Sequence, residues 1–127
     1  MREFKIPGKA QAKQRPRMGR TGIVYTPKET LVYENYVKMC YSDYANQFGW
    51  LPYENQVRAE IEVLVAVPKS DSKTKKKAKI EGMIRPAVKP DCDNLAKSIL
   101  DSLNGLAYHD DKQVVELSIK KYYAENA

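Results

Sequence analysis

The chain has 127 residues and a formal net charge of +6, which limits it to one domain, residues 1–127, and favours a polyanionic partner such as nucleic acid. Its two cysteines form no CxxC pair and its one histidine stands alone, so a structural zinc site lacks ligands and a reducing compartment is expected. The first residues lack an apolar signal core, and no apolar run approaches the ~20 residues that span a bilayer, so we predict a cytoplasmic protein without a membrane partner.

The start of the chain predicts a short strand followed by a basic arm. Phe4 and Ile6 alternate with polar residues, which indicates a half-buried strand that ends at Pro7. Residues 8–22 have the composition of a loop, and the loop's cations suit an arm lying along a phosphate backbone. Residues 23–25 are a candidate small strand. The candidate DNA-binding residues of this arm are Lys13, Arg15, Arg17 and Arg20.

A helix is predicted from Thr26 to about Asn46. Thr26 as N-cap, with Pro27 at the first helical position and Glu29 behind it, matches a capping box. Residues recurring at helical spacing indicate its buried face: Val32, Tyr36, Met39 and Cys40. The tyrosines of this helix suggest a base-stacking hypothesis, but we prefer core packing, because stacking platforms usually lie on sheets or loops.

The middle of the chain predicts one strand and one flexible loop. From Val57 to Val67, apolar residues alternate with charged ones, which is typical of a half-buried strand. Pro68 ends it, and a lysine-rich segment follows as a flexible loop through Met83. Solvated surface is the alternative interpretation of both basic segments. The candidate DNA-binding residues of this loop are Lys73, Lys75, Lys76 and Lys77.

The last third of the chain predicts a helix over residues 94–104 and a strand from Val115 to Tyr122 or Tyr123. The helix has one apolar stripe and is closed by Asn104 and Gly105. The element order is therefore β-α-β-α-β. This order favours an α+β fold, a small two-layer sandwich in which a mixed β-sheet carries two helices on one face.

Carboxylates gather around the start of that last helix. Asp91 and Asp93 lie two apart in an extended approach, so they project to the same side, and Lys97 follows one turn later. Like charges repel unless a cation lies among them, so the pattern predicts a hard metal ion. If the loop carrying Asp110 and Asp111 folds back over the start of the helix, three carboxylates meet the Lys97 ammonium.

Such a site suits phosphodiester hydrolysis. Mg²⁺ held by two or three carboxylates activates water and neutralises developing charge, and Lys97 could bind the attacking water or the scissile phosphate. An EF-hand is excluded because its sixth position would be Ala96 in place of glycine. The structural alternative is that Asp93 caps the helix and Lys97 pairs with Asp93 and Asp101 on its surface. That alternative leaves Asp91 and the later acidic pair unexplained.

Two sequence runs resemble a known family. KPDCDNLAKSILDSLNG (residues 89–105), followed by YHDDKQV (residues 108–114), is similar to the signature of the RusA family of crossover junction endodeoxyribonucleases. The resemblance implies a homodimeric, magnesium-dependent enzyme of prophage or phage origin, without a small-molecule cofactor, in which Mn²⁺ substitutes for Mg²⁺. Its substrate would be the four-way (Holliday) DNA junction of recombination and repair, cut by paired, symmetric nicks.

By motif, the resemblance implies a role for each acidic residue. Asp91, Asp93 and Asp111 would bind the metal, with Asp110 as the alternative to Asp111, and Lys97 would be the essential lysine. The two-fold symmetry of a homodimer would place two sites on two strands of like polarity. Two other functions stay open on the residues: a non-catalytic junction- or DNA-binding module, and a metal-dependent nuclease that acts on flaps or RNA.

Overall fold

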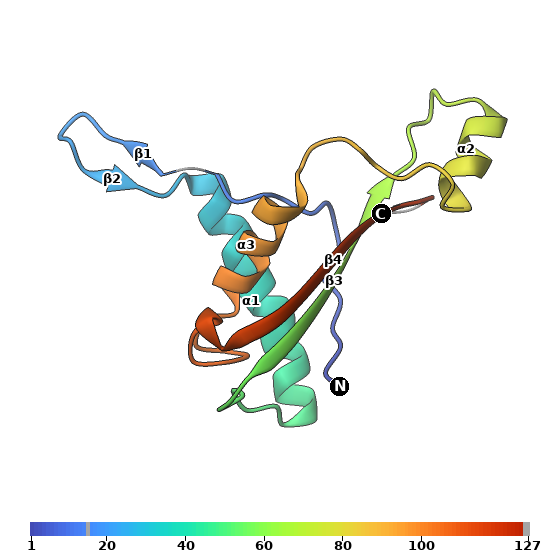
Figure 1. Cartoon of the computed structure of the whole chain (residues 1–127). Coiled ribbons are helices and arrows are strands. Elements are labelled where there is room, and N and C mark those ends of the chain that lie inside the picture. The colour runs from blue at the N-terminus through green and yellow to red at the C-terminus, as the bar shows by residue number, and fades with distance from the viewer. Residues whose placement is uncertain (15, 126–127) are drawn as a thin grey trace.

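The computed structural model describes residues 1–14 and 16–125 (Figure 1). Arg15, one of the candidate DNA-binding residues, lies outside the described residues. None of the helices in the described ranges is long and apolar enough to cross a membrane. The elements follow in this order: β1 (Arg17–Met18), β2 (Val24–Tyr25), α1 (Lys28–Phe48), β3 (Val57–Ala66), α2 (Lys73–Ile80), α3 (Cys92–Ser102), the 3-10 turn η1 (Asp111–Gln113) and β4 (Val114–Ala124).

The strands form two separate sheets. β1 and β2 pair antiparallel as a short hairpin that projects to one side of the molecule (Figure 1). β3 and β4 pair in parallel, from Val57 with Val114 to Ala66 with Ala124. A parallel pair needs a crossover, which α2 and α3 provide. The α+β class is confirmed, but the described residues form two two-stranded sheets in place of the predicted single mixed sheet.

The core lies between α1, α3 and one face of the β3–β4 sheet. Val57, Ile61 and Val114 of the two strands pack against a buried cluster. Burial of each large apolar side chain stabilises the fold by about 1.5–3 kcal/mol. Two helices therefore cover one face of this sheet, in agreement with the prediction. The buried cluster consists of Tyr33, Val37, Tyr41, Ile99, Leu103, Ala107 and Tyr108.

Helix α1 begins one residue later than predicted. Pro27 takes the N-cap position with an extended ψ of 144°, and the amides of Thr30 and Leu31 bond to its carbonyl at 3.1 and 3.2 Å. The predicted capping box of Thr26 and Glu29 is wrong, because the helix starts beyond the point where their side chains would cap it.

The buried face of α1 also differs from the predicted one. Val32 and Met39 are 59% and 54% exposed, whereas Tyr33 and Tyr41 are buried. Two overlapping rows of apolar side chains on α1 have helical spacing. The row that contains Tyr33 and Tyr41 is the one that packs against α3. The core interpretation is confirmed for Tyr33 and Tyr41, while Tyr36 is half-buried.

The predicted first strand is wrong, although its side chains are placed as a strand would place them. The segment has no hydrogen-bonded partner strand within the described residues and runs beside α1. The Phe4 and Tyr41 rings meet edge to face with centroids 5.1 Å apart, and the Tyr36 hydroxyl donates to the Pro7 carbonyl at 2.7 Å. The alternation of apolar and polar residues therefore predicted correctly that Phe4 and Ile6 pack against the core, but it predicted a sheet pairing that is not formed.

The lysine-rich segment predicted as a flexible loop is helix α2. The Ser72 hydroxyl caps it by accepting from the Lys75 amide at 3.2 Å, and the helix itself contains no glycine or proline. Lys79 forms an ion pair with Asp71 and lies 4.8 Å from the centroid of the Tyr123 ring on β4. These contacts hold α2 against β4, on the opposite side of the molecule from the β1–β2 hairpin (Figure 1).

Candidate functional site

The N-terminal end of α3 brings Asp91 and Asp93 together. Asp91 is the N-cap, with extended φ and ψ of −76° and 152°, and its carbonyl accepts from the Leu95 amide at 3.1 Å. Asp93 lies in the first turn, and both carboxylates are exposed. The cap is therefore Asp91 and not Asp93, and its side chain makes no capping hydrogen bond. Its carboxylate instead accepts from Asn94 Nδ2 at 3.0 Å.

Local donors keep Asp91 ionised. Its own backbone N–H lowers the pKa of the carboxyl most, followed by the Asn94 amide, and the charge of Lys121 acts in the same direction. An exposed pair of carboxyl groups is a set of oxygen ligands that a hard divalent cation prefers. The predicted extended approach is wrong for Asp93, because α3 begins at Cys92 and places Asp91 at the N-cap and Asp93 in the first turn.

Lys97 and Asp111 lie toward the other end of the helix. Lys97 Nζ is 3.5 Å from the carboxylate of Asp101, one turn further on, and its side chain is 61% exposed. Burial raises the pKa of Asp111 most, and the neighbouring carboxylates of Asp101 and Asp110 raise it further, whereas Lys97 lowers it. Asp111 thus belongs to a second carboxylate pair, formed with Asp101.

The side chains of Asp110 and Asp111 make different contacts. Asp110 caps η1. Its carboxylate accepts from the Lys112 amide at 3.2 Å, and the backbone amide of Asp110 donates to Gln113 Oε1 at 3.1 Å. The Asp111 side chain lies beside Asp101 and within the field of Lys97. Asp110 therefore has a structural role in the η1 cap, whereas the Asp111 side chain is directed toward the last turns of α3.

The three predicted metal ligands do not share one small volume. Among the described residues, no three His, Cys, Asp or Glu side chains are grouped closely enough to hold a metal ion. The chain after α3 turns back at the end of that helix, so Asp111 meets Asp101 and not Asp93. Eight residues of helix separate those two positions, a rise of about 12 Å. The carboxylates therefore form two pairs, with Lys97 between them in the sequence.

The Asp91–Asp93 pair nevertheless fits Mg²⁺. This ion keeps several waters and is usually bound through one or two carboxylates together with substrate phosphates. The donors at this end are all oxygen, and they are exposed to solvent. The pair could therefore hold Mg²⁺ without a third protein ligand.

The role of Asp101 was incompletely recognised from the sequence. Its predicted pairing with Lys97 is present, but Lys13 Nζ lies closer, at 2.8 Å, and also 3.2 Å from Glu34 of α1. Burial raises the pKa of Asp101, but the hydrogen bond and charge of Lys13 outweigh it, so the pKa is lowered overall. The same bond is the main reason why the pKa of Lys13 is raised. The signal in the sequence was the spacing of Asp101 four residues after Lys97.

Lys13 is thus placed in an ion-pair network with Asp101 and Glu34. Arg17 and Arg20 are exposed on and beside the hairpin. On α2, the side chains of Lys73, Lys75 and Lys77 are exposed, whereas Lys76 is half-buried. Two groups of cations therefore remain open to a phosphate backbone, one on each side of the molecule (Figure 1).

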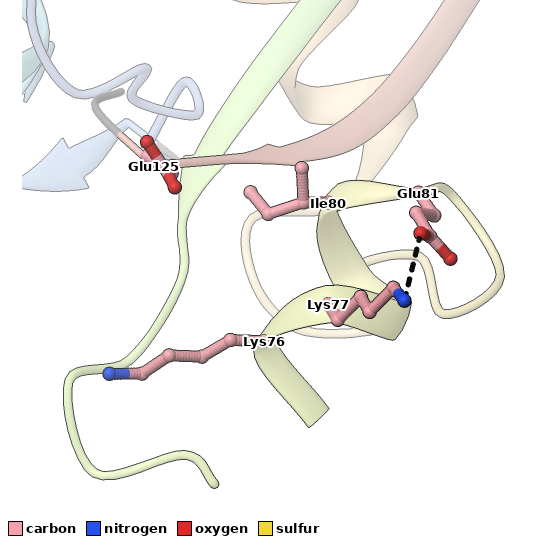
Figure 2. Close-up of a pocket in the computed structure, with 5 residues that line it drawn as sticks. All are labelled: Lys76, Lys77, Ile80, Glu81 and Glu125. Atoms are coloured by element: carbon pink, nitrogen blue, oxygen red, sulfur yellow. Dashed lines mark ion pairs between the residues drawn. The ribbon is translucent and has the colours of Figure 1, made fainter. Parts of the chain in front are cut away.

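A shallow pocket lies beside α2, but its lining is a weaker candidate for phosphate binding than the exposed lysines of that helix. Figure 2 shows Lys77 directed at Glu81, with 4.0 Å between the charged atoms, and Lys76 extending away from that pair. Two ammonium groups and two carboxylates balance the charge of its lining. It offers no net attraction for phosphate. The lining residues are Lys76, Lys77, Ile80, Glu81 and Glu125.

Comparison with known proteins identifies the family. The family model described as endodeoxyribonuclease RusA matches residues 7–127. The chain belongs to the RusA endodeoxyribonuclease family. A relative from Bacillus subtilis (strain 168), described as "Uncharacterized protein YqaN", is 35% identical over 128 residues, which cover 97% of this chain and 88% of the relative. The resemblance seen in the sequence is confirmed, and RusA family membership supports a nuclease that acts on DNA.

Proposed function

We propose that this RusA-family protein is a magnesium-dependent endonuclease that resolves four-way DNA junctions as a homodimer, in recombination or repair. The observation that carries the proposal is the family match over residues 7–127, because it includes both carboxylate pairs and Lys97. With this substrate, the protein would act in the cytoplasm of a bacterial or phage-infected cell. A prophage or phage origin is part of the same proposal.

The side chains of α3 divide the proposed chemistry. Asp91 and Asp93 would hold Mg²⁺, which when bound polarises a water and a phosphate oxygen. Lys97 lies one turn after Asp93, and its exposed ammonium can donate to the attacking water or to the scissile phosphate. Asp101 pairs with Lys97 at 3.5 Å, and Asp111 lies beside Asp101 at the far end of the helix. Asp111 lies beside Asp101 and is not grouped with Asp91 and Asp93, so it would act near Lys97 and not as a ligand of the same ion, and Mn²⁺ is the proposed substitute ion.

Two basic groups would position the DNA. The hairpin with Arg17 and Arg20 lies on one side of the molecule and α2 with its lysines on the other, with α3 between them (Figure 1). Phosphates bound on both sides would bring a backbone across α3. This placement supports a branched substrate, which offers backbones in several directions.

Exposed apolar side chains support the homodimer. Val115 and Leu117, two positions apart on β4, are 66% and 44% exposed. A second copy of the chain would remove such surface from water. Two-fold symmetry would then present two acidic helices to two strands of the junction. Sedimentation at several protein concentrations tests this, and a monomer throughout would reject the dimer.

Cleavage of matched substrates tests the function. The protein is incubated with an end-labelled four-way junction and with duplex of the same arm sequence, each with Mg²⁺ or with EDTA. We expect paired, symmetric nicks in the junction only when Mg²⁺ is present. Equal cutting of junction and duplex would reject junction specificity, and binding without products would indicate a non-catalytic module. Preferred cutting of RNA or flaps would identify a different nuclease.

A further inference from the structure

One lysine of strand β4 holds the segment that leads into the acidic helix. Lys121 Nζ donates to the Pro90 carbonyl at 2.9 Å and also to the Val88 carbonyl. In the other direction, Arg85 Nε donates to the Lys121 carbonyl at 2.9 Å, and its guanidinium lies 4.2 Å from the centroid of the Tyr122 ring. The hydrogen bonds that hold residues 85–90 against β4 are therefore all made by one residue of the strand, Lys121.

These bonds act on the backbone next to Asp91. The Pro90 carbonyl and the Asp91 amide belong to the same rigid, planar peptide unit. Fixing that carbonyl fixes the plane from which the Asp91 side chain departs. On the other side, the Asp91 carbonyl accepts from the Leu95 amide at 3.1 Å. Both peptide units flanking Asp91 are thus held, one by β4 and the other by α3.

We propose that Lys121 is a positioning residue for the Asp91–Asp93 pair, acting through the backbone of residues 88–90. The inference rests on the proposed nuclease function, in which that pair holds Mg²⁺. Two of the three N–H donors of the Lys121 ammonium bond to carbonyls of the chain, which gives this lysine a role in holding the backbone.

Three variants of Lys121 and one control variant of its neighbour Lys120 distinguish a positioning role from direct binding of phosphate. Lys121→Met keeps the aliphatic stem but removes the ammonium, and Lys121→Arg keeps both charge and donors. Lys121→Gln is a milder disruption, because its shorter, neutral amide reaches at most one carbonyl. Lys120→Met is the control. Lys120 is exposed and, as the neighbour of Lys121 on the strand, it points to the opposite face of the sheet.

Three measurements are made on the full chain. Hydrogen–deuterium exchange of residues 87–95 reports the backbone, and titration with Mn²⁺ alone reports the ligand pair. Single-turnover junction cleavage is compared with junction affinity in EDTA. For Lys121→Met we expect faster exchange in that segment, a loss of about 10- to 100-fold in Mn²⁺ affinity or cleavage rate, and junction affinity within about twofold. Lys121→Arg should recover most of the loss, and Lys120→Met should match the wild type.

Two outcomes would overturn the positioning role. One is unchanged exchange of residues 87–95 in folded Lys121→Met or Lys121→Gln. The other is a loss of junction affinity as large as the loss of cleavage, which would make Lys121 a phosphate ligand. Exchange and Mn²⁺ binding need no catalysis, so they test Lys121 even if the wild type cuts no junction. Failure of the wild type to cut would instead reject the proposed function.

Discussion

The two ends of helix α3 hold carboxylate pairs under opposite electrostatic conditions. At the N-terminal end, Asp91 and Asp93 are exposed, and neutral donors keep the pKa of Asp91 low. At the C-terminal end, Asp101 lies between the ammonium groups of Lys13 and Lys97, and its neighbour Asp111 has a raised pKa. The C-terminal pair is thus neutralised by the protein's own lysines, whereas the N-terminal pair is left for a cation from solution.

The largest expected effect is at the N-terminal end. Asp91→Asn removes one charge of the pair, so we expect single-turnover junction cleavage to fall by at least about 100-fold while junction affinity in EDTA is retained. Asp43→Asn, an exposed change on α1, is the matched control. A variant that still cuts at the wild-type rate would show that this end is not the metal site.

At the other end, Asp110 and Asp111 should give opposite results. Asp111→Ala should lower cleavage by about 10-fold or more, yet leave the thermal midpoint unchanged or raise it, because the ionised form of Asp111 is disfavoured in the fold. Asp110→Ala should keep cleavage but lose about 1 kcal/mol of stability with the η1 cap. The reverse result would assign the role in cleavage to Asp110.

Loss of the lysine that neutralises the C-terminal pair should destabilise the fold. Lys13→Met leaves Asp101 and Glu34, whose side chains are 16% and 14% exposed, without this partner, at a cost of about 1–3 kcal/mol. Lys9→Met, a change at an exposed lysine of the same segment, is the control. Urea unfolding measures both. Unchanged stability, together with weaker salt-dependent DNA binding, would return Lys13 to the DNA-binding surface.

The same variant should flatten the dependence of stability on pH. The Asp101 pKa is lowered in the fold, so its contribution is present above the ordinary value of 3.8 and is lost as pH falls through the folded value. The Lys13 pKa is raised, so its contribution is present below 10.5 and is lost as pH rises through the folded value. Unfolding free energies at acid, neutral and alkaline pH, with and without Lys13→Met, test both losses. Parallel profiles would contradict the pairing.

The smallest effect is expected from cations beyond both ends of α3. Replacing Lys73, Lys75 and Lys77 of α2 with Gln should weaken junction binding and reduce the salt slope by about 0.9 for each DNA phosphate that the variant no longer neutralises. Cleavage at saturating protein should hardly change. The matched comparison is Arg17→Gln with Arg20→Gln on the hairpin side. An unchanged slope would identify that group as solvated surface.

Residues with strong local patterns were predicted well. The alternation from Val57 and the apolar stripe of α3 each describe a local geometry, and the structure has both. The α2 helix was missed because a run of lysines resembles a solvated loop until its Ser72 cap and its packing against Tyr123 are seen. The ion pairs of Lys13 were not predicted, because its two acidic partners lie in distant elements.

The sequence by itself determined the RusA family, the α+β class and the identities of the acidic residues, because these depend on residue types at short, regular spacings. Only the tertiary structure decided how the carboxylates pair, since the return of the chain after α3 brings Asp111 to Asp101 and not to Asp93. It also placed Lys121 on the backbone before Asp91, across 31 residues of sequence. Contacts between distant segments depend on how the elements pack, and no local pattern records them.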